Sequence, residues 1–272
     1  MSQTDLPVIY VTHGAGPMMF LDSPAIPVFG EVGRRSPAAQ WYSQLSKQLA
    51  LPTVPKAILV VTAHWETANS VHISAKEKYT ELLYDYYGFP PEAYEIQYNP
   101  PGDVNLSKRI KSLLDQAGIS AKLDDKRNFD HGVFIPLKLI YPDANIPVVA
   151  ISVLKSLSPT EHLAIGRALA PLRKEGVFII GSGSSVHGFE VNAKQSHAFM
   201  TELKKVLIED NPQDREKALM NWDKVLPFAR INHPREEHLI PLHVIVGAAG
   251  SDRGQLLNPN VTEAQASFKF GI

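Results

Sequence analysis

Short apolar runs alternate with amphipathic segments along the chain, and this alternation is typical of an α/β protein. The runs expected to form strands are nearly continuous and rich in β-branched residues, and they lie at residues 7–12, 57–63, 70–75, 147–153 and 177–181. Continuous apolar strands indicate a sheet that is buried on both faces. We therefore expect one α/β domain over residues 1–272, with a central mixed or mostly parallel sheet covered by helices on both faces.

The segments between these runs carry helix signals. Residues 103–117 show them most fully, because Asp103 can cap the first turn, leucine and isoleucine recur at helical spacing, and Gly118 follows the last turn. Further elements are expected as helices at 38–50, about 132–140 and 160–174, two or three helices within 194–250, and an edge strand at 266–270.

Two segments break this alternation. Residues 84–102 are rich in proline and aromatic side chains, so this loop either forms the wall of a pocket or packs on its own rings. Residues 232–238 combine Pro234, which suits the first turn of a helix, with acidic residues that suit its positive end. We expect His238 to lie in the first two turns of that helix.

Three of the ten histidines, His13, His64 and His187, each follow an apolar run that is predicted to be a strand. The carboxyl ends of parallel strands meet at one edge of a sheet, so imidazoles that are far apart in the sequence can converge there. His131 and His238 also lie at element boundaries or beside glycine. Five histidines so placed favour a metal site or an acid/base site.

The other five histidines are expected away from that site: His72, His162, His197, His233 and His243. The first is expected to face solvent from a short strand, the next two lie in polar helical stretches and are expected at the surface, and the fourth flanks a helix start. His243 lies about 140° around a helix from His238, so these two should not share one metal ion.

Composition narrows the chemistry. Of the 272 residues 44% are apolar, and 27 lysines and arginines balance 28 acids to a net charge of -1, which indicates neither nucleic acid nor an anionic membrane as partner. No run approaches the roughly 20 apolar residues of a membrane span and no secretion signal is seen, so we expect a cytoplasmic protein with a small ligand. The absence of cysteine excludes disulfides and thiolate ligands, so nitrogen and oxygen must hold any metal.

Five local strings carry a family resemblance. They are Thr12-His13-Gly14-Ala15-Gly16-Pro17-Met18, Thr62-Ala63-His64-Trp65-Glu66, Asn128-Phe129-Asp130-His131-Gly132, Ser182-Gly183-Ser184-Ser185-Val186-His187 and Glu237-His238-Leu239-Ile240-Pro241-Leu242. In this order they resemble class III extradiol ring-cleavage dioxygenases of the DOPA 4,5-dioxygenase branch. The match also covers Gly88-Phe89-Pro90 and residues 141–147, so the resemblance runs almost end to end.

The resemblance implies a metal-dependent enzyme. It makes His13, His64 and His238 the candidate metal ligands, with Glu237 as an alternative to His238. It makes His187 an acid/base group or a further ligand, and it places His131 where substrate or the reacting oxygens bind. The implied cofactor is iron(II), with zinc(II) as the ion that isolated protein could carry. The implied partners are O₂ and a catechol such as DOPA or caffeate, opened to a semialdehyde by a monomer or small homo-oligomer.

These residue types suit that reaction. An iron(II) ion with three protein ligands on one face keeps open positions for both the diol and O₂. A nearby histidine can take a proton from one hydroxyl group and return it later.

Two other interpretations stay open. A zinc hydrolase would use the same histidines around a metal-bound water. A non-enzymatic protein similar to the Memo family would share the fold, but the Memo pocket usually carries a cysteine, which this chain lacks. Nucleotide binding is disfavoured, because the glycine-rich segment 181–185 lacks the third glycine or the lysine of the phosphate fingerprints.

Overall fold

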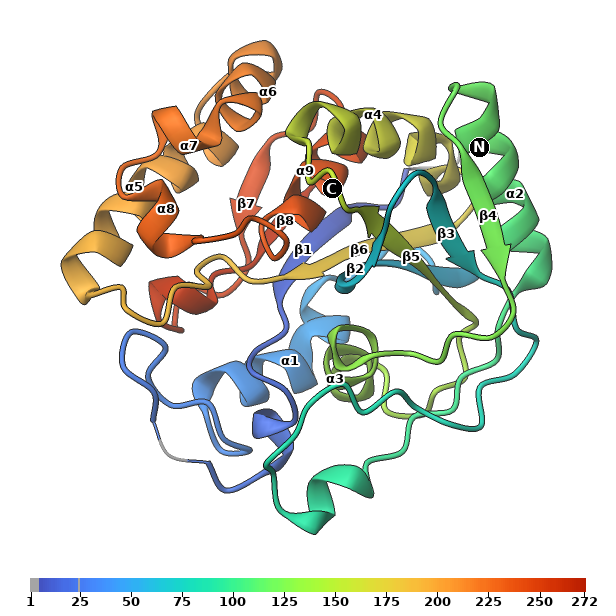
Figure 1. The fold of residues 1–272 in the computed structure, drawn as a ribbon, viewed down its shortest axis with the longest axis horizontal. Helices are drawn as coiled ribbons and strands as arrows, with labels where there is room; N and C mark the ends of the chain where they lie inside the picture. The colour runs from blue at the N-terminus through green and yellow to red at the C-terminus, as the bar shows by residue number, and fades with distance from the viewer. Residues whose placement is uncertain (1–4, 24) are drawn as a thin grey trace.

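A single mixed sheet forms the centre of the computed structural model, which describes residues 5–23 and 25–272 (Figure 1). Its strands are β1 (Val8–Thr12), β2 (Ala57–Thr67), β3 (Val71–Ser74), β4 (Ala121–Asp124), β5 (Val148–Leu154), β6 (Val177–Gly183), β7 (Gly254–Leu256) and β8 (Phe268–Phe270). Their order is β4-β3-β5-β2-β6-β1-β8-β7. β2, β6 and β1 are parallel neighbours at the centre, whereas β8 runs antiparallel to β1.

Several helices begin at a residue whose side chain caps the first turn. The described helices are α1 (Pro37–Gln48), α2 (Val104–Gln116), α3 (His131–Ile140), α4 (Pro159–Leu169), α5 (Ala193–Ile208), α6 (Pro212–Met220), α7 (Trp222–Val225), α8 (Ala229–Asn232) and α9 (Ile240–Ala249). The Asp103 side chain accepts a hydrogen bond from the Leu106 amide at 2.8 Å and so caps α2. Ser36 and Ser158 cap α1 and α4 in the same way, each followed by proline at the first helical position.

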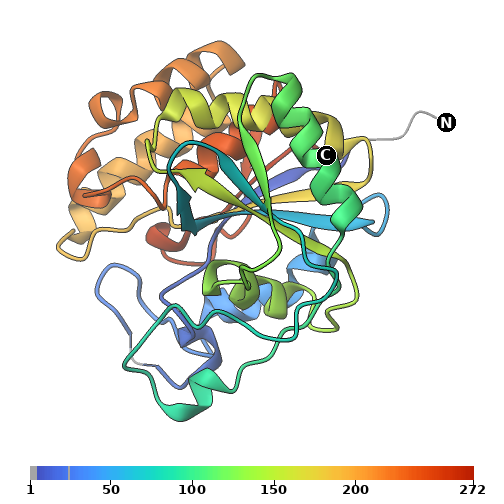
Figure 2. The ribbon, with the colours of Figure 1, turned by 45° about the vertical axis from the view of Figure 1, so that its right-hand side comes forward.

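The sheet separates two apolar layers. Val8 and Tyr10 of β1 pack with residues of α2, α4, α5 and α9, whereas Ile9 and Val11 pack on the opposite face with α1 and α3. Figures 1 and 2 show α1 and α3 together below the sheet and α4 with α9 above it. This alternation explains why the strands are apolar at successive positions. The predicted fold class is confirmed: one α/β domain with a mixed central sheet covered on both faces.

Several details differ from the sequence-based expectation. The region 194–250 contains five helices rather than two or three, because α7 and α8 are single turns of four residues. β4 and β7 were not predicted, and β8 lies between β1 and β7 rather than at the edge of the sheet. The helix predicted at 160–174 ends as α4 at Leu169 and continues as a 3-10 turn, Ala170–Arg173. Among residues 5–23 and 25–272, no helix combines the length and apolar character needed to cross a bilayer.

Candidate metal centre

Three central strands deliver histidines to one edge of the sheet. β2, β6 and β1 are parallel, so their carboxyl ends lie together. His13 directly follows β1, and His187 lies four residues beyond β6. His64 was expected after a strand but lies inside β2, where the pairing with β5 shifts register between Val61 and Glu66. Such an irregularity can turn a side chain out of the ladder toward a site.

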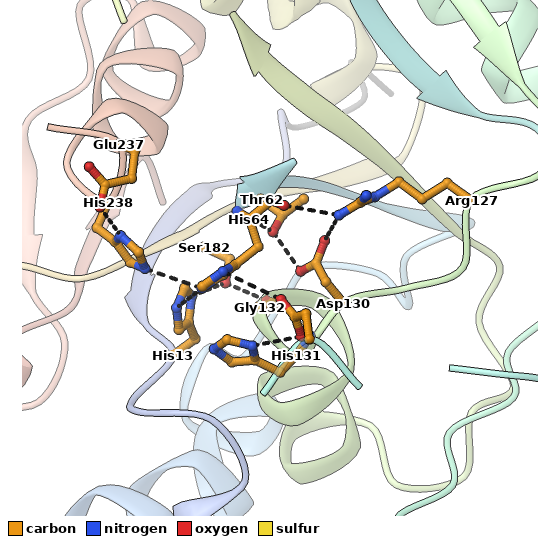
Figure 3. Close-up of polar contacts among 11 residues, drawn as sticks. His13, Thr62, His64, Arg127, Asp130, His131, Gly132, Ser182, Glu237 and His238 are labelled. Carbon is orange, nitrogen blue, oxygen red and sulfur yellow. Dashed lines mark hydrogen bonds and ion pairs between the residues drawn. The ribbon is translucent and has the colours of Figure 1, made fainter. Parts of the chain in front are cut away.

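Three Nε2 atoms converge at this edge (Figure 3). The Nε2 atom of His64 lies 3.1 Å from that of His13 and 3.2 Å from that of His238, and the ligand atoms of the three residues lie within 4.8 Å of one another. Nitrogen ligands at about 2.1 Å from one ion, with roughly 90–110° between bonds, lie about 3.0–3.4 Å apart. The spacing of His64 to each of the other two rings therefore matches that of nitrogen ligands on one metal ion.

The opposite nitrogen of each ring faces an oxygen atom. Nδ1 lies 2.9 Å from the Ser182 hydroxyl in His13, 3.4 Å from an Asp85 carboxylate oxygen in His64, and 2.9 Å from a Glu237 carboxylate oxygen in His238. The Ser182 hydroxyl donates its own hydrogen to the Gly132 carbonyl, so its oxygen accepts from Nδ1 of His13. A proton on each Nδ1 leaves the three Nε2 lone pairs directed at one another, and a bound cation relieves that repulsion.

Burial keeps these rings neutral. Desolvation and neighbouring imidazoles hold the pKa of His13 well below its ordinary value. Burial is also the largest cause that lowers the pKa of His64, to about 4, and it lowers the pKa of His238 although Glu237 opposes the shift. Neutral imidazole is the form that binds metal ions, so the donor set fits a divalent cation held by nitrogen.

Two carboxylates connect the converging rings to two further histidines. Asp85 faces Nδ1 of His131 at 2.8 Å as well as Nδ1 of His64. Glu237 faces Nδ1 of His187 at 3.3 Å as well as Nδ1 of His238. The structure thus brings all five predicted histidines together, with one carboxylate bridge on each side.

Both carboxylates are ionised. Burial would raise the pKa of Asp85, but the hydrogen bonds and charge of His131 outweigh it and lower the pKa overall. Burial likewise opposes ionisation of Glu237, yet hydrogen bonds from His187 and His238 hold its pKa well below the ordinary value. Asp85 was missed as a functional residue in the sequence. The available signal was its place at the start of the aromatic segment 84–102.

His238 is held by its backbone rather than by a helix. It was expected within the first two turns of a helix, but it lies in a turn two residues before α9, because Pro241 occupies the first turn of α9. Its carbonyl accepts hydrogen bonds from the Tyr10 hydroxyl at 2.8 Å and from the Ser184 amide at 3.0 Å. A Cβ atom at Gly183 would lie 2.0 Å from the same carbonyl oxygen, so only glycine permits this close approach.

The aromatic segment 84–102 combines both roles that were considered for it. The Tyr84 and Tyr86 hydroxyls donate to carbonyls within the segment, at 2.8 and 2.6 Å, so the loop does pack on itself. The Tyr86 ring also lies 5.9 Å from the His131 ring and 5.5 Å from that of Phe89. One side of the candidate site is therefore lined by aromatic rings.

The remaining histidines lie outside the group of five, and their exposure agrees with the prediction for some of them only. His197 has an exposed side chain (70%), as predicted, and His72 is partly exposed. His243 is buried, and its two ring nitrogens face the backbone carbonyls of Leu239 and Leu219 rather than the converging rings. The surface prediction for His162 is wrong, because this ring is fully buried and bonds the backbone of Leu154.

His233 is also buried, although it was expected only to flank a helix start. Its Nε2 atom lies 3.0 Å from the Ser185 carbonyl. The neighbouring Asn232 carbonyl accepts the His187 amide at 2.8 Å. These contacts hold the turn that carries His187.

Comparison with known proteins identifies the family. The sequence model of the protein family described as the catalytic LigB subunit of aromatic ring-opening dioxygenase matches residues 9–268. The chain belongs to this family. It is 36% identical to a 4,5-DOPA dioxygenase extradiol of Beta vulgaris, over 96% of this chain and 95% of the relative. It is 38% identical to that of Portulaca grandiflora, over 82% and 85%.

The resemblance to class III extradiol dioxygenases of the DOPA dioxygenase branch is thereby confirmed, and the chain is an extradiol ring-opening dioxygenase. A crystal structure of an uncharacterized protein from Escherichia coli K12 superposes with a TM-score of 0.73 at 27% identity, covering 98% of this chain and 100% of that one. The family implies a catalytic metal, an aromatic substrate and O₂.

Proposed function

We propose that this dioxygenase is iron(II)-dependent and opens the ring of a catechol with O₂ to give a semialdehyde. His13, His64 and His238 hold the metal in this proposal. The observation that carries it is the convergence of three neutral Nε2 donors whose Nδ1 atoms all face oxygen. Relatives that are named 4,5-DOPA dioxygenase support a catechol as the substrate class.

Iron(II), when bound, supplies open coordination positions for a diol and for O₂ and the electrons that activate oxygen. Glu237 is less suited than His238 to be the third ligand, because its Oε1 atom faces Nδ1 of both His187 and His238. Its role in the proposal is to orient these two rings.

His187 and His131 handle protons in this proposal. Glu237 holds Nδ1 of His187, and Asp85 holds Nδ1 of His131, so in both rings Nε2 is free to face a substrate oxygen. The ring of His187 stacks on that of His238 at 3.6 Å, and the ring of His131 lies 4.0 Å from that of His64. A base at either position can accept the proton of a bound catechol hydroxyl and return it to the opening product.

Reaction class is tested by oxygen uptake. Protein reconstituted anaerobically with iron(II) is expected to consume O₂ with a panel of catechols and to form a coloured semialdehyde. The zinc(II) form of the same preparation serves as control. Hydrolysis of esters or amides by the zinc form, without O₂ uptake by the iron form, would replace the dioxygenase by a zinc hydrolase.

The ligand set is tested separately by His64→Ala. This change removes one of three nitrogen donors, so metal stoichiometry after dialysis is expected to fall sharply, as measured by elemental analysis. His197→Ala is the matched control, because that ring is exposed and pairs with the surface carboxylate of Glu263. Full metal content in His64→Ala would contradict the assignment.

A further inference from the structure

An apolar cavity adjoins the candidate metal centre on the side of His187 and His238. Five apolar side chains line it: Ala15, Ile26, Phe29, Val32 and Phe189. The other lining residues are Gly14, Ser184, Gln265 and the two histidines, so no lysine, arginine, aspartate or glutamate lines it among the described residues. A substituent on a ring held at the metal centre can enter this cavity, because His187 and His238 belong to both.

Phe189 gives independent support for a ligand. This residue is 84% exposed although it lines the cavity, and its ring lies 5.7 Å from that of His187. Packing of the protein core does not account for an aromatic ring left in solvent. An apolar ligand that covers this ring would bury it.

Cations near the site are already paired. Arg127 lies against the Asp130 carboxylate at 3.1 Å, and Arg235 holds Glu66 through two hydrogen bonds of 2.6 and 2.5 Å. Arg34 and Arg35 follow the cavity-lining segment in sequence, but both pair with Asp22 and line a different surface hollow. None of these guanidinium groups lines the cavity.

From these observations we propose that the cavity binds an uncharged, apolar substituent of the catechol, rather than a carboxylate or an amino-acid group. This inference rests on the proposed function. A carboxylate or ammonium placed among these side chains would lose water without gaining a charged partner.

The test compares two catechols that differ in one charge, 3-(3,4-dihydroxyphenyl)propionate and its methyl ester. The iron(II) protein is expected to use the ester with a kcat/KM at least about tenfold higher, since unpaired burial of a carboxylate is costly. Phe189→Ala should lower kcat/KM for the ester more than for the acid. Because that side chain is exposed, the variant is expected to remain folded, which circular dichroism verifies.

A variant that introduces a positive charge makes the test sharper. Ile26→Lys places a cation in the cavity and is expected to reduce or reverse the preference for the ester. Val54→Lys, at a position that is 81% exposed in another loop, should leave this preference unchanged.

Equal use of both catechols by the parent, or preference for the acid, overturns the inference. If neither catechol is consumed, the proposed function fails. In that case, calorimetry of ester and acid binding to the zinc(II) form tests the inference independently of turnover. A ratio of the two dissociation constants near one overturns it.

Discussion

Asp85→Asn tests whether the carboxylate bridge orients a metal ligand. Asp85 Oδ1 accepts both the backbone N–H and the Nδ1–H of His131, at 2.9 and 2.8 Å, while Oδ2 faces Nδ1 of His64 at 3.4 Å. In the variant, the amide oxygen must stay on the His131 side, because an NH₂ group there would face a backbone N–H. The amide NH₂ is then directed at Nδ1 of His64.

That orientation of the amide favours the other tautomer of His64. An NH₂ donor opposite Nδ1 of His64 favours a lone pair on Nδ1 and places the proton on Nε2, the atom that converges with His13 and His238. Loss of a carboxylate behind a ligating histidine typically lowers metal affinity by about 10–100-fold. This corresponds to roughly 1.4–2.7 kcal/mol of binding free energy.

Affinity is measured by competition with a chelator under anaerobic conditions, alongside thermal unfolding of the metal-free protein. The two bonds to His131 survive in Asp85→Asn, so unfolding free energy is expected to change by only about 1 kcal/mol. Glu66→Gln is the matched control, because Glu66 is near the site but bonds Arg235 rather than an imidazole. Metal affinity within twofold of the parent in Asp85→Asn would refute the orienting role.

Two further predictions concern histidines with different duties. His187→Gln should retain metal but lose turnover by about 10²-fold or more, if the ring is a general acid or base; loss of metal would instead make it a ligand, and unchanged turnover would remove the role. Buried His162 donates from Nδ1 to the Ser158 carbonyl and accepts the Leu154 amide at Nε2, and burial lowers its pKa. Its contribution to stability is therefore present above pH ~6.5 and is lost as pH falls through the pKa of the folded state. We expect His162→Ala to unfold more easily at pH 8 and to show a weaker dependence of unfolding free energy on pH, as measured by urea titrations at several pH values. The same pH dependence in parent and variant would contradict this.

Local signals were sufficient for much of the architecture. The helix at α2 was predicted because Asp103, the leucine spacing and Gly118 all agree, and the central strands were predicted because both their faces are buried. β4 and β7 lacked such a signal. Lys122 and Leu123 of β4 are exposed, and β7 has only three residues, so pairing with neighbours rather than composition defines these strands.

The candidate site was predictable to the extent that strand ends and family strings mark it. The role of Asp85 was not predictable, because its partners His64 and His131 are 21 and 46 residues away in the sequence. Only the fold brings the three side chains together. His162 was misjudged for a related reason. A polar helix sequence does not reveal that the ring of His162 turns inward and accepts the amide of Leu154, at the end of the preceding strand.

The partners of β1 bear on the timing of folding. The Tyr10 hydroxyl bonds the His238 carbonyl 228 residues away, and β1 also pairs with β8. Synthesis at about 5–20 residues per second separates these partners by roughly 10–50 s. During that interval His13 and His64 are present without His238, so the emerging chain lacks one of the three proposed metal ligands. Metal supply is thus expected to act on the last step of folding, and the yield of folded enzyme in cells should rise with the metal content of the medium.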